Sequence, residues 1–336
     1  MRDDLQSLVQ DIQSLRSPVR TFLNELYRRY LPLRDGRIAD YIPELAKADP
    51  ESFGISLVTV DGRTFNAGDS DRRFTIQSIS KPFVYGLALE DWGRDYVLRR
   101  VGVEPTGEAF NSIVLDEESN RPYNPMVNAG AIATAGLIRG ADPAERINRM
   151  LAMVRRFTGR EALVDAAVFT SERTTGHRNR AIGHLMLNFG MVDSNVEEIL
   201  DLYFQQCSVL VTSHDLAMMA ATLANGGIHP VTGEQAIDPQ YVRDLLSVMY
   251  TCGMYNFAGE WCHTIGVPAK SGVSGGVMAV VPGRMGIGIY SPALDNRGNS
   301  VRGIAVCTEL SEQLNLHVFS PSSVRSPLAR ALEPVK

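Results

Sequence analysis

Two of the four lysines in this chain stand in motifs that are typical of enzymes with an active-site serine. Arginine supplies 29 of the 33 basic residues, so lysine is rare here. Lys81 ends the tetrapeptide SISK, residues 78–81, and Lys270 begins the tripeptide KSG, residues 270–272. An early Ser-x-x-Lys followed by a late Lys-Ser/Thr-Gly is the pattern of serine acyl-transfer enzymes. Since lysine can release its proton readily and arginine cannot, Lys81 is a candidate general base.

The segment around Ser78 has the pattern of a helix entry. Residues 74–93 run from a β-rich start into FVYGLALEDWG, and Pro82 fits only the first turn of that helix. Ser78 then lies at or just before the helix N-terminus, with Lys81 three residues later on the same face. There the amine can reach the Ser78 hydroxyl, and the Ser78 N–H can stabilise an oxyanion. In the alternative interpretation, Ser78 or Ser80 is an N-cap and Lys81 is solvated.

The composition describes an ordinary globular protein. The 336 residues are 44% hydrophobic and 21% charged, with a net charge of −5 and a pI near 5.7. This charge gives no general attraction to nucleic acid or acidic membranes. Four cysteines without metal-ligand spacing argue against zinc and fit a reducing compartment. Because the acidic start lacks a signal-peptide pattern and no apolar run approaches membrane-spanning length, we expect a soluble, cytoplasmic protein.

Strand patterns occupy the two ends of the chain, and helical patterns occupy the middle. Residues 54–68 have the pattern of a hairpin around Asp61-Gly62. Residues 275–310 have the pattern of three further strands, followed by a helix at 311–317. The long segment between them shows helical spacing. We therefore predict an α+β fold, in which N- and C-terminal strands form one antiparallel sheet with a large intervening helical region.

We predict that the chain is divided into three parts. Apolar residues at helical spacing between Leu5 and Leu15 predict an N-terminal helical extension. The predicted parts are this extension (1–34), a catalytic domain (35–319) and a loose C-terminal tail (320–336). Within the catalytic domain, the sheet is expected at about 50–77 and 270–319, and the helical part at about 78–269.

Seven motifs follow one another in register between about Gly36 and Phe319. They are GRIADYIPELA (36–46), FTIQSISKPF (74–83), YNPMVNAGAI (123–132), SERTTGHRNRAI (171–182), LYFQQCS (202–208), YTCGMYNFAGE (250–260) and AKSGVSGG (269–276). Through them the chain resembles the serine-dependent glutaminase family, whose fold is of the penicillin-binding-protein and β-lactamase type. A lone Ser-x-x-Lys would not separate this family from β-lactamases, whereas the seven motifs do.

The resemblance implies roles for nine residues. Ser78 is the implied nucleophile and Lys81 its base, while Tyr255 or Tyr203 would hold or relay the proton. Glutamine would be bound at the matching positions, which are Tyr41, Ser78, Asn128, Glu172, Asn179, Tyr203, Tyr255 and Val273. If the resemblance is set aside, each of these residues has a purely structural interpretation, as a helix cap, a solvated loop residue or a packing tyrosine.

The chemistry of free glutamine accounts for these residue types. Glu172 can pair with the ammonium group, and Asn128 can add an acceptor oxygen. Asn179 and a tyrosine hydroxyl can donate to the carboxylate. The Val273 N–H, together with that of Ser78, would complete an oxyanion hole.

The implied reaction is hydrolysis of L-glutamine to L-glutamate and ammonia through an acyl-serine intermediate, without a metal or organic cofactor. Relatives of this kind are often homo-oligomers, so a dimer or tetramer is expected. Three alternatives stay open. A β-lactamase or transpeptidase shares the serine–lysine chemistry but acts outside the cytoplasm, and an asparaginase-like enzyme would differ only in pocket length. An amino-acid sensor would keep the fold without turnover, although it has no need for Ser78 and Lys81.

Overall fold

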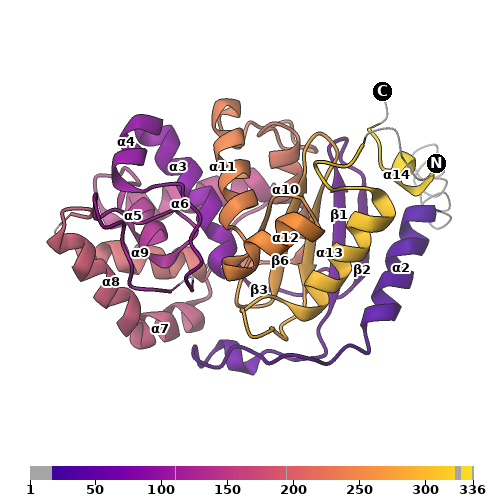
Figure 1. Cartoon of the computed structure of the whole chain (residues 1–336), viewed down its shortest axis with the longest axis horizontal. Helices are drawn as coiled ribbons and strands as arrows, with labels where there is room; N and C mark the ends of the chain where they lie inside the picture. The colour runs from indigo at the N-terminus through magenta and orange to yellow at the C-terminus, as the bar shows by residue number, and fades with distance from the viewer. Residues whose placement is uncertain (1–16, 110, 194, 322–326, 335–336) are drawn as a thin grey trace.

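A computed structural model describes residues 17–109, 111–193, 195–321 and 327–334. A five-stranded antiparallel sheet stands at one side of the molecule, and most of the helices lie beside it (Figure 1). In sheet order, the strands are β2 (Thr64–Gly68), β1 (Gly54–Thr59), β7 (Met285–Tyr290), β6 (Gly276–Val281) and β5 (Ala269–Ser271). The predicted α+β fold is confirmed, since strands from both ends of the chain share one sheet.

Tight turns set the register of the two hairpins in this sheet. The turn between β1 and β2 falls at the predicted Asp61-Gly62, where Gly62 has a φ of +83°. The turn between β6 and β7 contains Gly283, with a φ of +71°. Glycine adopts such angles without strain, so both hairpins are encoded locally. The pairing of β1 with β7 along the whole length of both strands then joins the two hairpins into one sheet.

Helix α10 (Ser213–Ala224) lies between the sheet and the rest of the helices. It begins with a capping box, in which Thr212 and Asp215 exchange side chain–backbone hydrogen bonds. It then packs closely against β7, and a Cβ atom at Gly286 would lie 2.1 Å from the Ala217 carbonyl oxygen. Only glycine permits this approach of two backbones. One face of the sheet is therefore sealed by α10.

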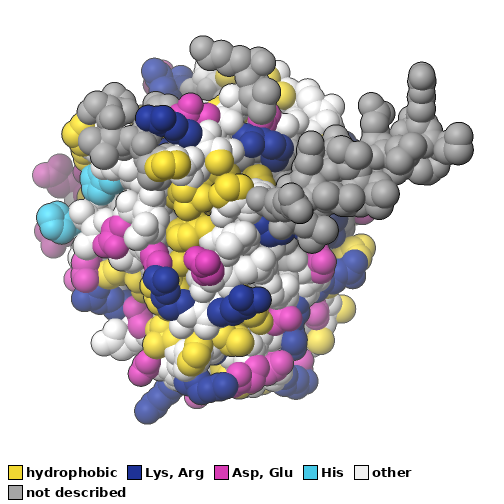
Figure 2. Space-filling view, turned by 90° about the vertical axis from the view of Figure 1, so that its right-hand side faces the viewer, with side chains coloured by type: hydrophobic (Ala, Val, Ile, Leu, Met, Phe, Trp, Pro, Cys, Tyr) yellow, Lys and Arg dark blue, Asp and Glu magenta, His cyan; other side chains and the backbone are white. Residues whose placement is uncertain are grey.

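The opposite face of the sheet is covered by helices from the two ends of the chain. These are α2 (Pro18–Tyr30), α12 (Ala258–Thr264), α13 (Val301–Leu314) and α14 (Pro327–Ala331). Together with the strands they enclose a second hydrophobic core, in which Trp261 is fully buried. Figure 2 looks onto this end of the molecule and shows basic, acidic and hydrophobic side chains mixed over the visible described surface.

The helical region contains the remaining helices and a short two-stranded sheet. The helices are α3 (Lys81–Trp92), α4 (Arg94–Arg100), α5 (Asn128–Gly136), α6 (Pro143–Thr158), α7 (Ala166–Thr175), α8 (His177–Asn188), α9 (Val196–Cys207) and α11 (Pro239–Cys252). The short sheet pairs β3 (Phe74–Thr75) with β4 (Leu210–Val211), and the 3₁₀ turns are η1 (Leu45–Lys47), η2 (Gln77–Ser80) and η3 (Tyr255–Phe257). Within the described ranges, every helix is too short or too polar for a bilayer span.

The predicted strand at residues 300–310 is wrong, because this segment lies in α13. The helix predicted at 311–317 instead starts at Val301. The Ser300 hydroxyl caps it by accepting a hydrogen bond from the Gly303 N–H, and Val306 and Leu310 lie on its buried face. The N-cap and the helical spacing of the apolar residues thus outweigh the β-propensity of the residues in this segment. The additional strand of the sheet is β5.

The C-terminal tail is not loose at residues 327–334, contrary to the prediction. Helix α14 packs on α2 and α13, with Ala329 and Leu332 fully buried. Arg63 donates to the carbonyl oxygens of Ala331 (2.8 Å) and Glu333 (2.6 Å). At the other end, α2 is helical as expected, while the positions from Leu5 to Leu15 lie outside the described residues.

Replacing Gly286 by alanine tests the packing of α10 on the sheet. Because the new methyl group would overlap the α10 backbone, Gly286→Ala is expected to lower the free energy of unfolding by about 1–3 kcal/mol. Urea unfolding followed by circular dichroism measures this change. Gly259→Ala in α12 is the matched control, since nothing lies within 4 Å of a Cβ atom placed there. Equal stability losses in the two variants would contradict the close packing.

Candidate active site

Ser78 lies where the sheet meets the helical region. The pairing of β3 with β4 and a 2.8 Å hydrogen bond from the Ile76 N–H to the Val209 carbonyl fix the chain just before η2. Helix α3 follows directly, with Lys81 as its first residue. Ser78 is therefore held from both sides, and its side chain reaches a cavity although the residue is only 6% exposed.

The turn between Ser78 and Lys81 differs from the predicted helix start. Residues 77–80 form a 3₁₀ turn, in which positions three apart lie directly above one another, and the Lys81 N–H donates to the Ser78 carbonyl. Ser80 occupies the N-cap position of α3, but its hydroxyl donates to the Gln77 carbonyl at 2.7 Å instead of capping the helix. Lys81 is fully buried, which excludes the solvated alternative.

The amine of Lys81 is enclosed by two neutral acceptors. Its Nζ atom donates to Asn128 Oδ1 at 2.7 Å and to the Met126 carbonyl at 3.1 Å. Burial lowers the pKa of Lys81 to about 8, although the electrostatic interactions with Cys207 and Glu172 act in the opposite direction. A lysine with this pKa is neutral in roughly a fifth of molecules near physiological pH, far more than an ordinary lysine, and the neutral amine is the form that a general base requires.

Two residues that line the cavity have backbone N–H groups for which the described chain provides no acceptor. Ser78 and Val273 both line it, and within the described residues neither N–H donates a hydrogen bond to the protein. Val273 is placed by the tight turn between β5 and β6, in which the Gly275 N–H donates to the Gly272 carbonyl. Two free N–H donors beside a nucleophile are the arrangement of an oxyanion hole.

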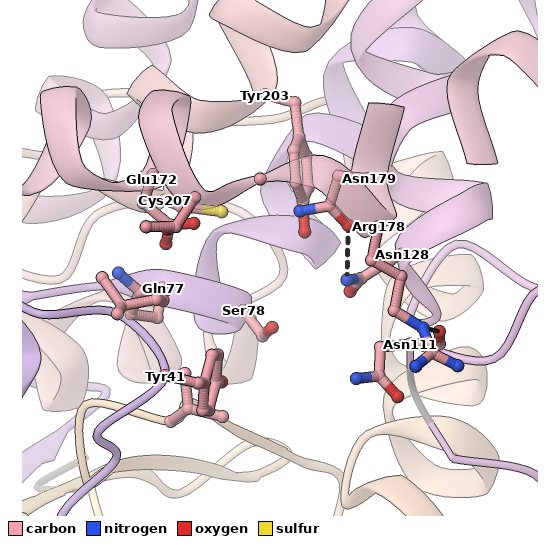
Figure 3. A pocket seen from close by; sticks show the side chains of 14 residues that line it. Tyr41, Gln77, Ser78, Asn111, Asn128, Glu172, Arg178, Asn179, Tyr203 and Cys207 are labelled. Carbon is pink, nitrogen blue, oxygen red and sulfur yellow. Dashed lines mark hydrogen bonds between the residues drawn. The ribbon is translucent and has the colours of Figure 1, made fainter. Parts of the chain in front are cut away.

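The cavity has a volume of about 260 Å³ and opens beside the Ser78 hydroxyl (Figure 3). Seven of the predicted residues line it, namely Tyr41, Ser78, Asn128, Glu172, Asn179, Tyr203 and Val273. Lys81 and Tyr255 do not line it and lie behind Ser78. A larger cavity of about 870 Å³ shares Tyr41, Asn111 and Val273 with the first, so Tyr41, which is 55% exposed, marks the border between them.

Glu172 supplies the negative charge of the cavity. It is only 6% exposed, and burial raises its pKa to about 7, while a hydrogen bond from the Gln77 side chain and the charge of Lys81 lower it. A carboxylate that lacks a direct basic partner becomes more stable when a cation is placed next to it. The end of the cavity next to Glu172 is therefore suited to an ammonium group.

Hydrogen-bond donors gather on the other side of Ser78 (Figure 3). Asn128 Nδ2 donates to Asn179 Oδ1 at 2.9 Å, which leaves the Asn179 amide N–H groups for a ligand. The Arg178 side chain lies nearby and donates from Nε to the Asn111 carbonyl at 2.6 Å. Amide donors and a guanidinium group suit a carboxylate, so the two sides of the cavity complement the two charged ends of an amino acid.

Two tyrosines of the candidate site are buried. Tyr255 donates to the Ser271 carbonyl at 3.1 Å and shares a hydrogen bond with Ser78. Burial raises the pKa of both Tyr203 and Tyr255 above the usual value, so each phenol keeps its proton at neutral pH. Burial likewise raises the pKa of the Cys207 thiol, so this cysteine keeps its proton at neutral pH and lacks the thiolate that a nucleophilic cysteine needs.

Comparison with known proteins adds a second line of argument to this geometry. A family profile described as Glutaminase matches residues 36–319. The chain belongs to the glutaminase family. A glutaminase from Trichormus variabilis is 67% identical over 309 residues, which cover 92% of each chain. The family prediction is confirmed, and the chain is an amidohydrolase by this membership.

Solved structures of this family have the same fold. A structure of Mglu in its glutamate form superposes with a TM-score of 0.88 at 46% identity, covering 91% of this chain and 71% of that one. A probable glutaminase from Bacillus subtilis, complexed with 6-diazo-5-oxo-L-norleucine, gives a TM-score of 0.83 at 36% identity and covers 90% and 97% of the two chains.

Three residues with amide or guanidinium side chains line this glutaminase-family cavity but were not expected from the sequence. Gln77, Asn111 and Arg178 line it, and Gln77 does so from a left-handed backbone conformation with a φ of +51°. Gln77 directly precedes Ser78, and Arg178 directly precedes Asn179, inside the motifs of the family. This position next to predicted site residues could have identified both as cavity residues. Asn111 comes from an irregular segment between α4 and α5.

Proposed function

We propose that this enzyme hydrolyses L-glutamine to L-glutamate and ammonia through an ester of the Ser78 hydroxyl. The observation that carries the proposal is the placement of Ser78 beside a buried lysine of lowered pKa, at a cavity with one acidic and one donor-rich side. Mglu in its glutamate form, a relative of the same fold, supports an amino acid of this size as the product.

In the proposed complex the ends of glutamine are held apart and its side chain points at Ser78. Glu172 pairs with the ammonium group. Asn179 and Arg178 donate to the carboxylate, while Tyr203 and Tyr41 close the cavity around the aliphatic part. Tyr41 and Val273 lie toward the larger cavity, so substrate enters and product leaves on that side.

Acylation requires one base and one oxyanion hole. Neutral Lys81 takes the Ser78 proton as Oγ attacks the side-chain amide carbon, and the N–H groups of Ser78 and Val273 hold the negative oxygen. The intermediate collapses when the carbon–nitrogen bond breaks and the amide nitrogen takes up the proton. Ammonia leaves and a glutamyl ester of Ser78 remains.

Deacylation repeats the same steps with water. Lys81 takes a proton from water as its oxygen attacks the ester, and the oxyanion is held by the same two N–H groups. Collapse of the intermediate returns the proton to Ser78 and releases glutamate. Since its phenol is protonated, Tyr255 relays a proton between Ser78 and the leaving nitrogen and does not act as the base.

The alternatives differ in measurable products. An asparaginase-like enzyme would release ammonia faster from L-asparagine than from L-glutamine, and a sensor would bind glutamine without releasing ammonia. Cytoplasmic localisation and a homo-oligomeric state remain predictions from sequence and resemblance.

Ser78→Ala is expected to abolish ammonia release from L-glutamine, because no ester can form without the hydroxyl. Coupled-enzyme detection of ammonia measures this, with L-asparagine and D-glutamine as alternative substrates. Ser52→Ala is the matched control, since Ser52 is equally buried but lines neither cavity. Full activity in Ser78→Ala would overturn the acyl-serine mechanism, and no release from the wild-type enzyme would overturn the glutamine assignment.

Glu172→Gln is expected to raise KM for L-glutamine roughly 10- to 100-fold, because a charge-assisted contact of about 1.5–3 kcal/mol is lost. The value of kcat should fall less, since Glu172 does not touch the amide. Glu234→Gln, at a carboxylate on the surface, serves as the control. An unchanged KM in Glu172→Gln would remove Glu172 from the ammonium site.

The pH dependence of kcat/KM should report two deprotonations of the free enzyme. As the pH falls through about 8, Lys81 gains a proton and can no longer act as base. As it falls through about 7, Glu172 becomes neutral and no longer attracts the substrate ammonium. Activity therefore increases with pH through this window. Glu172→Gln should retain only the step of Lys81, and a flat wild-type profile would contradict both assignments.

A further inference from the structure

Lys270, the other lysine of the two sequence motifs, is buried on the active-site side of the sheet. It lies in β5 opposite Met278 of β6, and both side chains are fully buried. Successive residues of a strand point to opposite faces, and Met278 belongs to the core on the side of the helical region. Lys270 lines none of the cavities described above, so it is not placed to touch a substrate.

The contacts of Lys270 converge on Tyr255. Its Nζ atom lies 4.3 Å from the centre of the Tyr255 ring and donates to the Ser271 carbonyl at 2.7 Å. The Tyr255 hydroxyl donates to the same carbonyl oxygen at 3.1 Å. One backbone oxygen therefore ties the amine and the phenol together, and the phenol in turn shares a hydrogen bond with Ser78.

The backbone of Tyr255 needs this support. Its φ of +55° is a left-handed conformation that a bulky residue adopts only when surrounding contacts hold it there. The ring is fixed from one side by the Lys270 amine, and the hydroxyl is fixed by Ser271. Without these contacts, the phenol would be free to leave Ser78.

The surroundings of Lys270 offer little to an ammonium group. The ionisable groups that affect it are Lys81, Cys252 and Cys207, and within the described chain it makes no ion pair. Burial and, after it, the charge of Lys81 hold the pKa of Lys270 well below its usual value. A buried amine without a carboxylate costs folding free energy, so stability alone does not explain its presence.

We propose that Lys270 is a positioning residue for catalysis, which holds the Tyr255 phenol against Ser78 through the shared Ser271 carbonyl and the face of the ring. The inference deepens the proposed function and rests on the role of Tyr255 in the reaction. Lys270 acts only through Tyr255, so it affects turnover and leaves substrate binding unchanged.

A double-mutant cycle tests this dependence. Lys270→Met removes the amine and keeps a side chain of similar length, Tyr255→Phe removes the phenol, and a third variant combines both. We expect Lys270→Met to lower kcat roughly tenfold or more, and Tyr255→Phe to lower it roughly 100-fold. The combined variant should match Tyr255→Phe, because the amine has nothing left to position. KM for L-glutamine should stay unchanged in Lys270→Met.

Stability measurements and two further variants complete the design. Since an unpaired buried amine is removed, the melting temperature of Lys270→Met is expected to equal or exceed that of the wild type. Met278→Leu, on the strand directly opposite, is the matched control and should keep wild-type kcat. Lys270→Arg retains N–H donors for Ser271 and should keep more kcat than Lys270→Met.

The outcomes distinguish the role of Lys270 from the role of Tyr255. Three kinetic outcomes would overturn the role of Lys270 alone. They are kcat losses that multiply in the combined variant, a wild-type kcat in Lys270→Met, and a raised KM for L-glutamine in Lys270→Met. A lowered melting temperature that accounts for the lost activity, or equal losses in Lys270→Arg and Lys270→Met, would overturn it as well. Wild-type kcat in Tyr255→Phe would remove Tyr255 from the proposed mechanism and the inference with it.

Discussion

The burial of the Lys81 amine is the constraint on which the candidate site depends. In water a lysine has a pKa near 10.4 and stays charged at neutral pH. Here burial lowers the pKa to about 8, and the neutral acceptors Asn128 and Met126 satisfy the amine without fixing it as a cation. A carboxylate in direct contact raises the pKa of a lysine and opposes its use as a base.

The architecture provides this burial by bringing distant segments together. Residues 74–92 supply Ser78 and Lys81, α5 supplies Asn128, and the turn after β5 supplies Val273. The pairing of β1 with β7 and the close packing of α10 hold the C-terminal strands beside the helical region. Each segment reaches the cavity with one or two side chains, so its shape depends on the whole core.

Charge is distributed around Ser78 in a way that separates binding from chemistry. Glu172 and the donors around Asn179 lie in the cavity, where they meet solvent or substrate. Lys81 and Lys270 are fully buried, Tyr255 is nearly so, and none of the three lines this cavity. In the proposed mechanism, groups in the first set bind the substrate, whereas groups in the second take part in or support proton transfer.

The sequence by itself determined the family, the α+β class and seven of the residues that line the cavity, because motifs and turn glycines act locally or carry family information. It misassigned residues 300–310, where a Ser300 cap and burial against the sheet decided for helix α13 over strand propensity. Only the tertiary structure placed Asn111 at the cavity, gave Gln77 its left-handed conformation and brought Lys270 against Tyr255. These features depend on contacts between residues far apart in the chain, which no local pattern encodes.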